Sequence, residues 1–545
     1  MAEGIEFELW APYNERALLV GEFLEDQTVA MQKASDGYFR TTVELADGRY
    51  AYKFRVQSKS DFALDAWVEI VDPYATRVDE IEQSAIALVK DGQRIVDDYV
   101  WQHEAAELPS NESLVIYEML VQDFAGEPSG TFQAVIERLD YLKSLGVNAL
   151  ELMPVQACPG ETGWGYNTRH YFALRSDYGE PSDFKQLVDA CHARGMRVIL
   201  DVVLNHSEAE SPLTQIDYSY WYRQEPKDPD NSWGPEFDYD HYDEHLDSYP
   251  ARAFMQAVIN FWITEYHIDG LRFDAVKQIA NPEFLNWLTD QAGQTAQPKT
   301  FYSIGERIPE KPALSVYSGP MDGCWRDSFH HTCLPLLLGK GIAFDQLKQL
   351  VDITQSGYQS AIDAINFITS HDHGHLMADL AAADVFDQAA FKRAKLGAAL
   401  VLTAMGVPMI WMGEEFGEYK EKTLDPAPLD WSLLDSPPNA ELLDYYQGLV
   451  NLRTANAALQ SSNLAFLHEN PDDCVLGYVR WHELGSQVVV IVNASNRYIA
   501  NYEIDQLPED GGWHEWTKDY DVQVEGGRLV IDLPEYEAQV LVWSA

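Results

Sequence analysis

Charged side chains close several otherwise apolar segments of this sequence. Arg272 and Asp274 lie two residues apart in "GLRFDAV", Glu306 ends "FYSIGE", and His371 and Asp372 follow "AINFITS". Residues two apart on a strand share a face, so Arg272 can hold the Asp274 carboxylate ionised. Glycosidic cleavage needs two carboxyl groups beside the bond, one as acid/base and one as nucleophile or as base for water. Position alone leaves a structural Arg272–Asp274 ion pair open as the alternative.

These segments belong to a repeated alternation of buried strands and helices. Apolar residues at helical spacing, such as Phe184, Leu187 and Val188, precede the strand-like run "MRVILDVVLNH", and similar units follow along the chain. This alternation predicts an α/β fold, a (β/α)8 TIM barrel. A doubly wound open sheet is the alternative, but no G-x-G-x-x-G follows an early strand. In a parallel barrel the strand ends meet at one mouth, so we expect the three carboxylates to converge there.

The segments on either side of the barrel have a different pattern. Residues 1–98 alternate in short runs such as "IEFELWAP" and "GRYAYKFRV" between turn signals, which predicts an N-terminal β-sandwich. The catalytic barrel is assigned to residues 110–455, with a long polar and aromatic insertion at 207–250 that should overhang its mouth. Residues 456–545 return to strand alternation and predict a C-terminal antiparallel β domain.

The charge of the chain limits its partners. The sequence has 87 acidic and 38 basic residues, a formal net charge of -49, which repels nucleic acid and anionic membranes. The N-terminal "MAEGIEFELW" lacks the pattern of a secretion signal, and the five cysteines show no C-x-x-C pair. We therefore expect a cytoplasmic protein with reduced thiols and with neither nucleic-acid nor membrane partners. The sequence leaves the oligomeric state open.

Four of the strand-end segments together form a specific pattern. "DVVLNH", "GLRFDAV", "GER" and "SHD", in this order, resemble the four signature segments of the α-amylase superfamily of retaining glycoside hydrolases. The resemblance covers nearly the whole chain. The N-terminal segment with "WAP" and "GEF" is similar to the carbohydrate-binding-type module of branching and debranching members, and the C-terminal segment is similar to the family's usual third domain.

The resemblance implies a role for each matching residue. Asp274 would be the nucleophile, Glu306 the general acid/base, and Asp372 the carboxylate that holds sugar hydroxyls in the transition state. In "WGYNTRHYF", Tyr166 is similar to the family's aromatic platform beneath the sugar. The remaining expected substrate-binding residues are Trp164 in that segment, His206, Arg272, His371, and Asp201 behind Arg272.

Departures from the motifs bear on which family member the chain resembles. Val276, Lys277 and Gln278 follow Asp274 where many hydrolytic α-amylases carry a Lys-His pair, and Ser370 stands where Asn commonly precedes the His-Asp pair. We expect a retaining hydrolase of α-1,4-glucosidic bonds in starch, glycogen or maltooligosaccharides. The alternatives are a 1,4-α-glucan branching transglycosylase, a debranching or maltooligosyl-trehalose hydrolase, and a non-catalytic glucan-binding protein.

Other polar clusters have alternative interpretations. A zinc site is conceivable among His330, His331, Cys333, His371, His373 and His375, but neither H-E-x-x-H nor C-x-x-C accompanies them. No cofactor is expected to be required. A structural calcium ion remains open but is not indicated, because the insertion is shorter than the lobe of many calcium-dependent amylases. "GEEF" at residues 413–416 could add carboxylates to the site or cap a helix.

Overall fold

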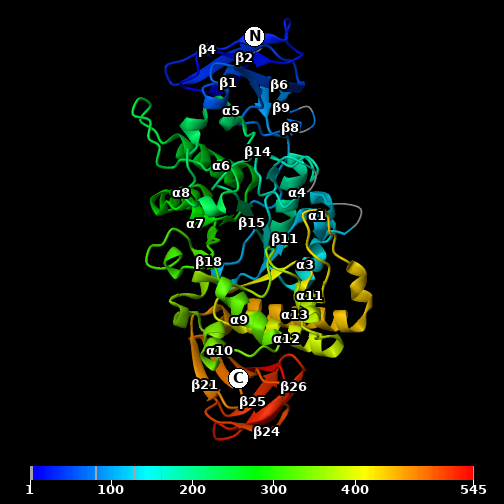
Figure 1. The fold of residues 1–545 in the computed structure, drawn as a ribbon. Helices are drawn as coiled ribbons and strands as arrows, with labels where there is room; N and C mark the ends of the chain where they lie inside the picture. Colours follow the sequence, from blue (N-terminus) through cyan, green and yellow to red (C-terminus); the bar gives the residue numbers. More distant parts are fainter. Residues whose placement is uncertain (1–3, 80, 82, 127–129, 161–162, 544–545) are drawn as a thin grey trace.

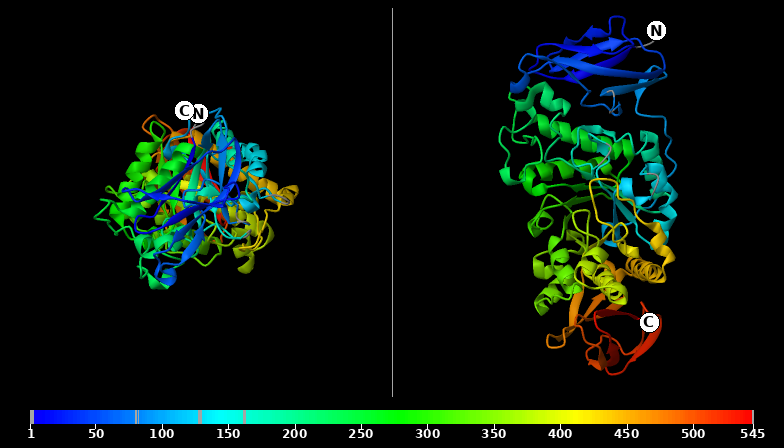
Figure 2. Two further views of the ribbon diagram at one scale, coloured as in Figure 1. Left: turned by 90° about the horizontal axis from the view of Figure 1, so that it is seen from above. Right: turned by 45° about the vertical axis from the view of Figure 1, so that its right-hand side comes forward.

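The computed structural model describes residues 4–79, 81, 83–126, 130–160 and 163–543. Three parts follow one another along the long axis of the molecule: N-terminal sheets, a central barrel surrounded by helices, and C-terminal sheets (Figures 1 and 2). The central part confirms the predicted TIM barrel, and no doubly wound sheet is found among the described residues.

Within the described residues, eight parallel strands close the barrel, each pairing with the next in chain order and the last with the first. Every residue of these strands is buried, since side chains fill the barrel on one face and helices cover the other. The strands are β11 (Ile116–Met119), β12 (Ala149–Leu152), β15 (Arg197–Val202), β16 (Gly270–Phe273), β17 (Tyr302–Gly305), β18 (Gly323–Trp325), β19 (Ala364–Phe367) and β20 (Val407–Trp411).

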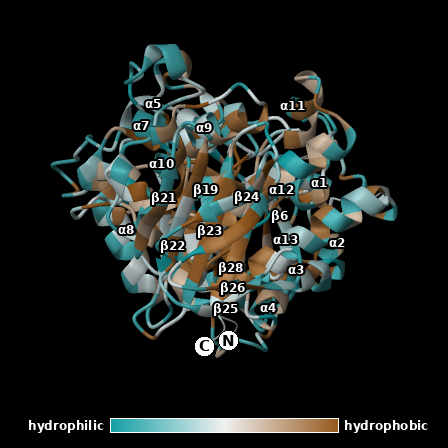
Figure 3. Ribbon diagram, turned by 90° about the horizontal axis from the view of Figure 1, so that it is seen from below, coloured by the Kyte–Doolittle hydropathy of each residue, from teal (hydrophilic) through white to brown (hydrophobic). Residues whose placement is uncertain are grey.

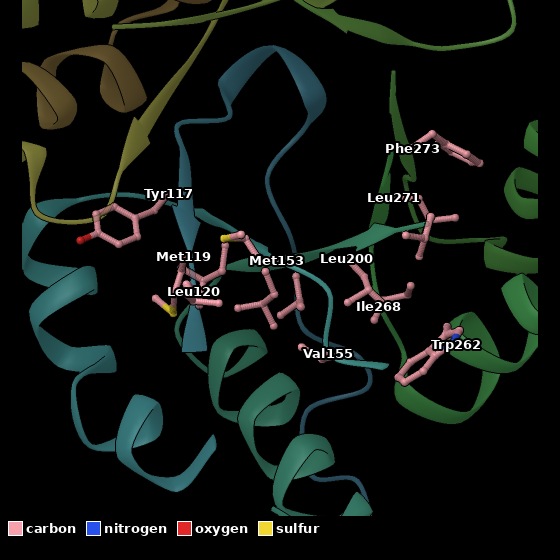
Figure 4. Packing of buried hydrophobic residues seen from close by; sticks show 14 of the residues in the cluster. Tyr117, Met119, Leu120, Met153, Val155, Leu200, Trp262, Ile268, Leu271 and Phe273 are labelled. Atoms are coloured by element: carbon pink, nitrogen blue, oxygen red, sulfur yellow. The ribbon is translucent and has the colours of Figure 1, made fainter. Parts of the chain in front are cut away.

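The helices bury their apolar side chains against the outer face of the barrel. Figure 4 shows Ile268 near Trp262, with Leu200 and Leu271 following it in the same apolar cluster. The helices are α1 (Val121–Phe124), α2 (Phe132–Glu137), α3 (Leu139–Leu145), α4 (Pro181–His192), α5 (Pro212–Trp221), α6 (Pro250–Tyr266), α7 (Val276–Ile279), α8 (Pro282–Ala296), α9 (Asp327–Leu337), α10 (Phe344–Val351), α11 (Leu376–Ala382), α12 (Asp387–Thr403), α13 (Pro437–Ala455) and α14 (Ala457–Gln460). None of the described helices is long and apolar enough to cross a membrane.

The N-terminal part is built from antiparallel strands around a small core that includes Phe7, Tyr52 and Phe54. One sheet has the order β1-β5-β4 and a second has the order β10-β9-β6-β2-β3. The strands are β1 (Ile5–Trp10), β2 (Ala17–Val20), β3 (Thr28–Ala30), β4 (Gln32–Lys33), β5 (Tyr38–Val43), β6 (Gly48–Gln57), β7 (Trp67–Ile70), β8 (Val78–Asp79), β9 (Ser84–Lys90) and β10 (Gln93–Ile95).

The C-terminal part is also antiparallel. Its larger sheet has the order β21-β22-β23-β28-β25-β26, and β22, β23 and β28 form the apolar centre that is brown in Figure 3. The strands are β21 (Leu464–Asn470), β22 (Val475–Trp481), β23 (Gln487–Asn493), β24 (Ile499–Ile504), β25 (Gly511–Glu515), β26 (Tyr520–Val524), β27 (Leu529–Leu533) and β28 (Glu537–Trp543). A short hairpin of β13 (Gln156–Ala157) and β14 (His170–Leu174) follows β12.

The N-terminal sheets contact the main chain of the insertion. Ser60 Oγ donates a hydrogen bond to the Thr214 carbonyl at 2.5 Å, and Ser58 Oγ donates to that of Gln215 at 2.7 Å. The Ile216 carbonyl accepts from Asn14 Nδ2 at 3.0 Å and from the backbone N–H of Lys59 at 2.9 Å. These carbonyls belong to α5, so the insertion is held between the N-terminal sheets and the barrel.

Candidate active site

A cavity of about 440 Å³ lies at the carboxyl ends of the barrel strands. Most of the residues predicted for the site meet there, although they come from distant segments of the sequence. The insertion contributes Asn231 and Trp233 to the lining of the same cavity. The predicted residues that line the cavity are Trp164, Tyr166, His206, Asp274, Glu306, His371 and Asp372.

Arg272 lies behind the cavity and joins two of the carboxylates. The register of β15 and β16 pairs Asp201 with Arg272, which brings their side chains to one level. Arg272 Nη1 lies 2.9 Å from both carboxylate oxygens of Asp201 and 2.9 Å from Asp274 Oδ1. The guanidinium also stacks on Trp325, 4.5 Å from the ring centre. Arg272 is only 1% exposed, and its paired carboxylates offset the cost of burying its charge.

Glu306 lies beside Asp274 on the next strand. The backbone ladder continues past the strand ends, since Asp274 N–H donates to the Val202 carbonyl and Glu306 N–H to that of Phe273. Glu306 Oε2 accepts a 2.7 Å hydrogen bond from the backbone N–H of Ala275 and lies 4.0 Å from Arg272 Nη2. Ala275 has φ +50°, a strained conformation of the kind that clusters at functional sites.

The electrostatics of Glu306 suit a group that gives and takes a proton near neutral pH. Burial, reinforced by the Asp274 charge, raises the pKa of Glu306 to about 7, against the opposing effect of Arg272. At pH 7 the carboxyl is therefore divided between its protonated and ionised forms. A general acid works best when its pKa lies near the operating pH.

Tyr166 and His371 contact each other in the cavity lining. Tyr166 OH donates to Asp201 Oδ2 at 2.6 Å and lies 2.9 Å from His371 Nε2, and the two rings stack with centres 5.2 Å apart. Asp372 Oδ1 lies 3.3 Å from His371 Nε2. Although burial acts in the opposite direction, His371 holds the pKa of Asp372 well below its usual range. Asp372 is thus an ionised acceptor at the cavity wall.

The two remaining predicted residues in the cavity lining are Trp164 and His206. Trp164 donates from Nε1 to the Thr423 carbonyl at 3.0 Å and meets the His371 ring edge-on. His206 is buried near Trp233, with ring centres 5.9 Å apart. Burial lowers the pKa of His206, so its imidazole is neutral at pH 7 and can either donate or accept a hydrogen bond.

Sequence reasoning missed two residues that contact this constellation. Trp325 lies on β18, whose segment "GCW" is too short for a periodic pattern to show. Glu118 is the third residue of the strand β11, and both its carboxylate oxygens face His371. An acidic residue in the apolar run "VIYEML" is the same kind of signal that singled out Asp274, so it could have been found.

The histidine-rich segments have structural partners. His373 Nδ1 lies 2.9 Å from Ser370 Oγ, and His330 Nδ1 lies 2.6 Å from the Ile368 carbonyl. Within the described residues, no three His, Cys, Asp or Glu side chains are arranged to hold a metal ion.

The glutamates of "GEEF" lie outside the cavity lining. Glu414 accepts from Thr369 and Tyr446, and Glu415 accepts from Tyr117 and Tyr141. Both side chains are buried, and burial raises the pKa of each to about 7. Their partners make them packing residues behind the barrel mouth.

Comparison with known proteins agrees with this architecture. Residues 115–307 match the α-amylase catalytic domain, and residues 1–75 match carbohydrate-binding module 48, the isoamylase N-terminal domain. The chain is 30% identical to malto-oligosyltrehalose trehalohydrolase of Saccharolobus solfataricus over 448 residues, which span 76% of this chain and 74% of the relative. It is 26% identical to the 1,4-alpha-glucan branching enzyme GlgB of Corynebacterium jeikeium, over 97% of this chain and 78% of that enzyme.

A solved structure shares the fold over the full chain. The structure of pullulanase type I from Bacillus subtilis, in complex with maltose, superposes with a TM-score of 0.84 at 22% identity, covering 100% of this chain and 85% of the pullulanase. With the barrel and its strand-end residues described above, these matches show that the chain belongs to the α-amylase superfamily, whose members cleave or transfer glycosidic bonds.

Proposed function

We propose that this protein hydrolyses α-1,4-glucosidic bonds in maltooligosaccharides and related α-glucans, with retention of configuration at the anomeric carbon. The observation that carries the proposal is the shared position of Asp274 and Glu306. Arg272 contacts the first and lies near the second, and the Ala275 N–H beside Asp274 binds Glu306. A carboxylate group bound by an arginine and a carboxyl group with a pKa near 7 therefore face the same small volume, as a double-displacement mechanism requires.

In the first step, a carboxylate oxygen of Asp274 attacks the anomeric carbon of the sugar. Glu306 gives its proton to the glycosidic oxygen, so the leaving chain departs with a free hydroxyl group. Arg272 orients Asp274 through its 2.9 Å contact, and the stacked Tyr166 ring supports the apolar face of the sugar. Asp372 accepts hydrogen bonds from sugar hydroxyls, which its ionised state allows.

In the second step, Glu306 acts in the reverse sense. Its carboxylate takes a proton from water, and the resulting oxygen nucleophile attacks the anomeric carbon and releases Asp274. A sugar hydroxyl can replace water here, which would make the enzyme a branching transglycosylase. Hydrolysis and transfer share the first step, so the residues described support both, and the acceptor decides the outcome.

The relative from Saccharolobus solfataricus favours a specific second candidate. Its similarity extends over three quarters of both chains and its name specifies release of trehalose. The candidate substrate is therefore a maltooligosaccharide that ends in trehalose, cleaved by the same two carboxyl groups. The two candidate reactions would differ only in the leaving group that Glu306 protonates, which is trehalose in one and a glucan chain in the other.

The test is a product analysis on three substrates. The purified protein is incubated with amylose, maltoheptaose and maltooligosyl-trehalose, and reducing ends, free trehalose and α-1,6 linkages are followed by proton NMR. New reducing ends without branches support the proposal. Trehalose as the main product supports the second candidate, branches with few reducing ends make the protein a transglycosylase, and no change in any substrate rejects all three.

A further inference from the structure

Glu118 makes a two-point contact with His371. Its Oε1 lies 2.6 Å from His371 Nδ1, and its Oε2 accepts from the backbone N–H of His371 at 3.1 Å. Glu118 is 1% exposed, and the two residues are 253 positions apart in the chain. Oε2 accepts from a backbone donor, so a protonated Glu118 would have to carry its proton on Oε1 and the imidazole would have to accept it. The ionised form satisfies both contacts with N–H donors.

The opposite ring nitrogen also faces acceptors. Tyr166 has one hydroxyl proton and gives it to Asp201 Oδ2 at 2.6 Å, so toward His371 its oxygen accepts. Burial, followed by the Asp201 charge, keeps the pKa of Tyr166 well above its ordinary value, so the hydroxyl remains protonated. Asp372 Oδ1, 3.3 Å from the same nitrogen, is a second acceptor. Nε2 of His371 therefore carries hydrogen, and with the proton of the 2.6 Å Glu118 contact on Nδ1 the ring is an imidazolium ion.

We infer that Glu118 is a positioning residue that keeps His371 doubly protonated and thereby fixes Tyr166 and Asp372 around the bound sugar. The role toward the bound sugar rests on the proposed function, whereas the charge on His371 does not depend on it. A neutral imidazole has one N–H and could donate toward only one side of the ring. The cation donates to Glu118 and, at the same time, toward Tyr166 and Asp372.

The charges around His371 support the cationic form. Although burial opposes it, the carboxylates of Asp372 and Glu118 raise the pKa of His371 to about 10. Lys422, which hydrogen-bonds the Ser370 carbonyl, lies nearby, but burial lowers the pKa of its amino group to about 7, so the charge that opposes the cation is largely lost at pH 8. The titratable and charged groups around His371 are Glu118 of β11, Glu151 of β12, Tyr166 after β12, Asp201 of β15, Arg272 of β16 against the Tyr166 ring, Asp372 beside it and Lys422 after β20.

The direct test is the protonation state of His371 in the full-length protein. Histidine labelled with ¹³C at Cε1 is incorporated, the His371 resonance is assigned by its loss in His371→Gln, and the shift is followed from pH 5 to pH 10. We expect His371 to be cationic at pH 8 in the unaltered protein. In Glu118→Gln it should titrate at least ~2 pH units lower, because the carboxylate that stabilises the cation is gone. A neutral His371 at pH 8, or an unchanged titration in Glu118→Gln, overturns the inference.

Kinetics provide a readout that a purely structural role would not change. Glu118→Gln should lower kcat/KM at pH 8 by roughly ten- to a hundredfold and shift the pH optimum toward acid, where His371 regains its proton. Glu118→Asp, which keeps the charge, should restore the shape of the pH profile. The matched control is Glu415→Gln, a buried glutamate whose partners are Tyr117 and Tyr141, and its profile should be that of the unaltered protein.

The outcomes separate the inference from the proposed function. If the unaltered protein hydrolyses no glucan, the function is rejected, while the NMR titration still decides whether Glu118 holds His371 charged. If Glu118→Gln does not fold, the titrations of the unaltered protein and of Glu118→Asp decide the same point. A Glu118→Gln variant with a normal pH optimum would reject the positioning role even if its activity is lowered.

Discussion

Glu306 is the residue on which the proposed chemistry depends most directly. Its pKa of about 7 predicts that kcat/KM falls as pH rises through 7, because only the protonated carboxyl can supply the leaving group with a proton. Glu306→Gln should lower kcat by about 10²–10⁴-fold and abolish this alkaline limb. The measurement is a pH profile of reducing-end release from maltoheptaose. A variant that keeps both its rate and its alkaline limb would show that another group is the acid.

Single residues were predictable where a charged side chain closes an apolar run. Asp274, Glu306 and Asp372 stand out because burying a charge is costly, and a cleft is where such a cost is tolerated. Trp325 gave no such signal, because an apolar ring in a buried strand is the ordinary case. The grouping of Glu118 with His371 could not be read from the chain, because the two residues are 253 positions apart and meet only when the barrel closes.

Some of the strands that carry these residues could be predicted from the sequence, and others could not. Runs such as "VILDVVLNH" are long and rich in β-branched residues, so their type was clear. The strand β18 has only three residues, and its place in the barrel is fixed by pairing with β17 and β19 rather than by its own pattern. The site depends on β18, the strand with the shortest sequence pattern, because its Trp325 stacks on the guanidinium of Arg272.

Glu415, in the segment after β20, should make the stability of the protein depend on pH. Burial raises the pKa of Glu415 from its ordinary value of 4.5 to about 7, so between these values the folded chain holds a proton that the unfolded chain has lost. The unfolding free energy should therefore fall as pH rises from 4.5 to 7, by up to about 3 kcal/mol from this group.

Glu415→Gln removes this titration while keeping an acceptor for Tyr117 and Tyr141. The stability of the variant relative to the unaltered protein should therefore be higher at pH 8 than at pH 5. Denaturant unfolding at both pH values measures the difference, with Glu441→Gln, an exposed carboxylate, as control. A difference that is the same at both pH values would show that Glu415 stays ionised when buried.

At the scale of the whole molecule, charge dominates. A net charge of -49 on a folded chain produces self-repulsion that disfavours the compact state. Added salt screens this repulsion, with a Debye length of about 10 Å at 0.1 M and about 3 Å at 1 M. We expect the Tm to rise by at least a few degrees between low salt and 1 M NaCl, and by less in sucrose of equal osmolality. A Tm that is flat or falls with NaCl would contradict this account.

The overall order of the three parts followed from the sequence, because strand alternation and helical spacing change visibly along the chain. The contacts between the three parts could not be predicted from the sequence. The N-terminal sheets meet the insertion through hydrogen bonds to main-chain carbonyls, and such acceptors leave no trace in the sequence of the insertion.

These contacts have a consequence for how the chain can be inherited. Ser60 and Thr214 are 154 positions apart, yet the serine hydroxyl satisfies a buried carbonyl that would otherwise lack this donor. A recombination event that replaced the N-terminal segment alone would bring new side chains against an old loop and leave its carbonyls unmatched. The first hundred residues and the insertion should therefore be inherited together. Although they lie at two separate places in the gene, recombination should exchange both or neither.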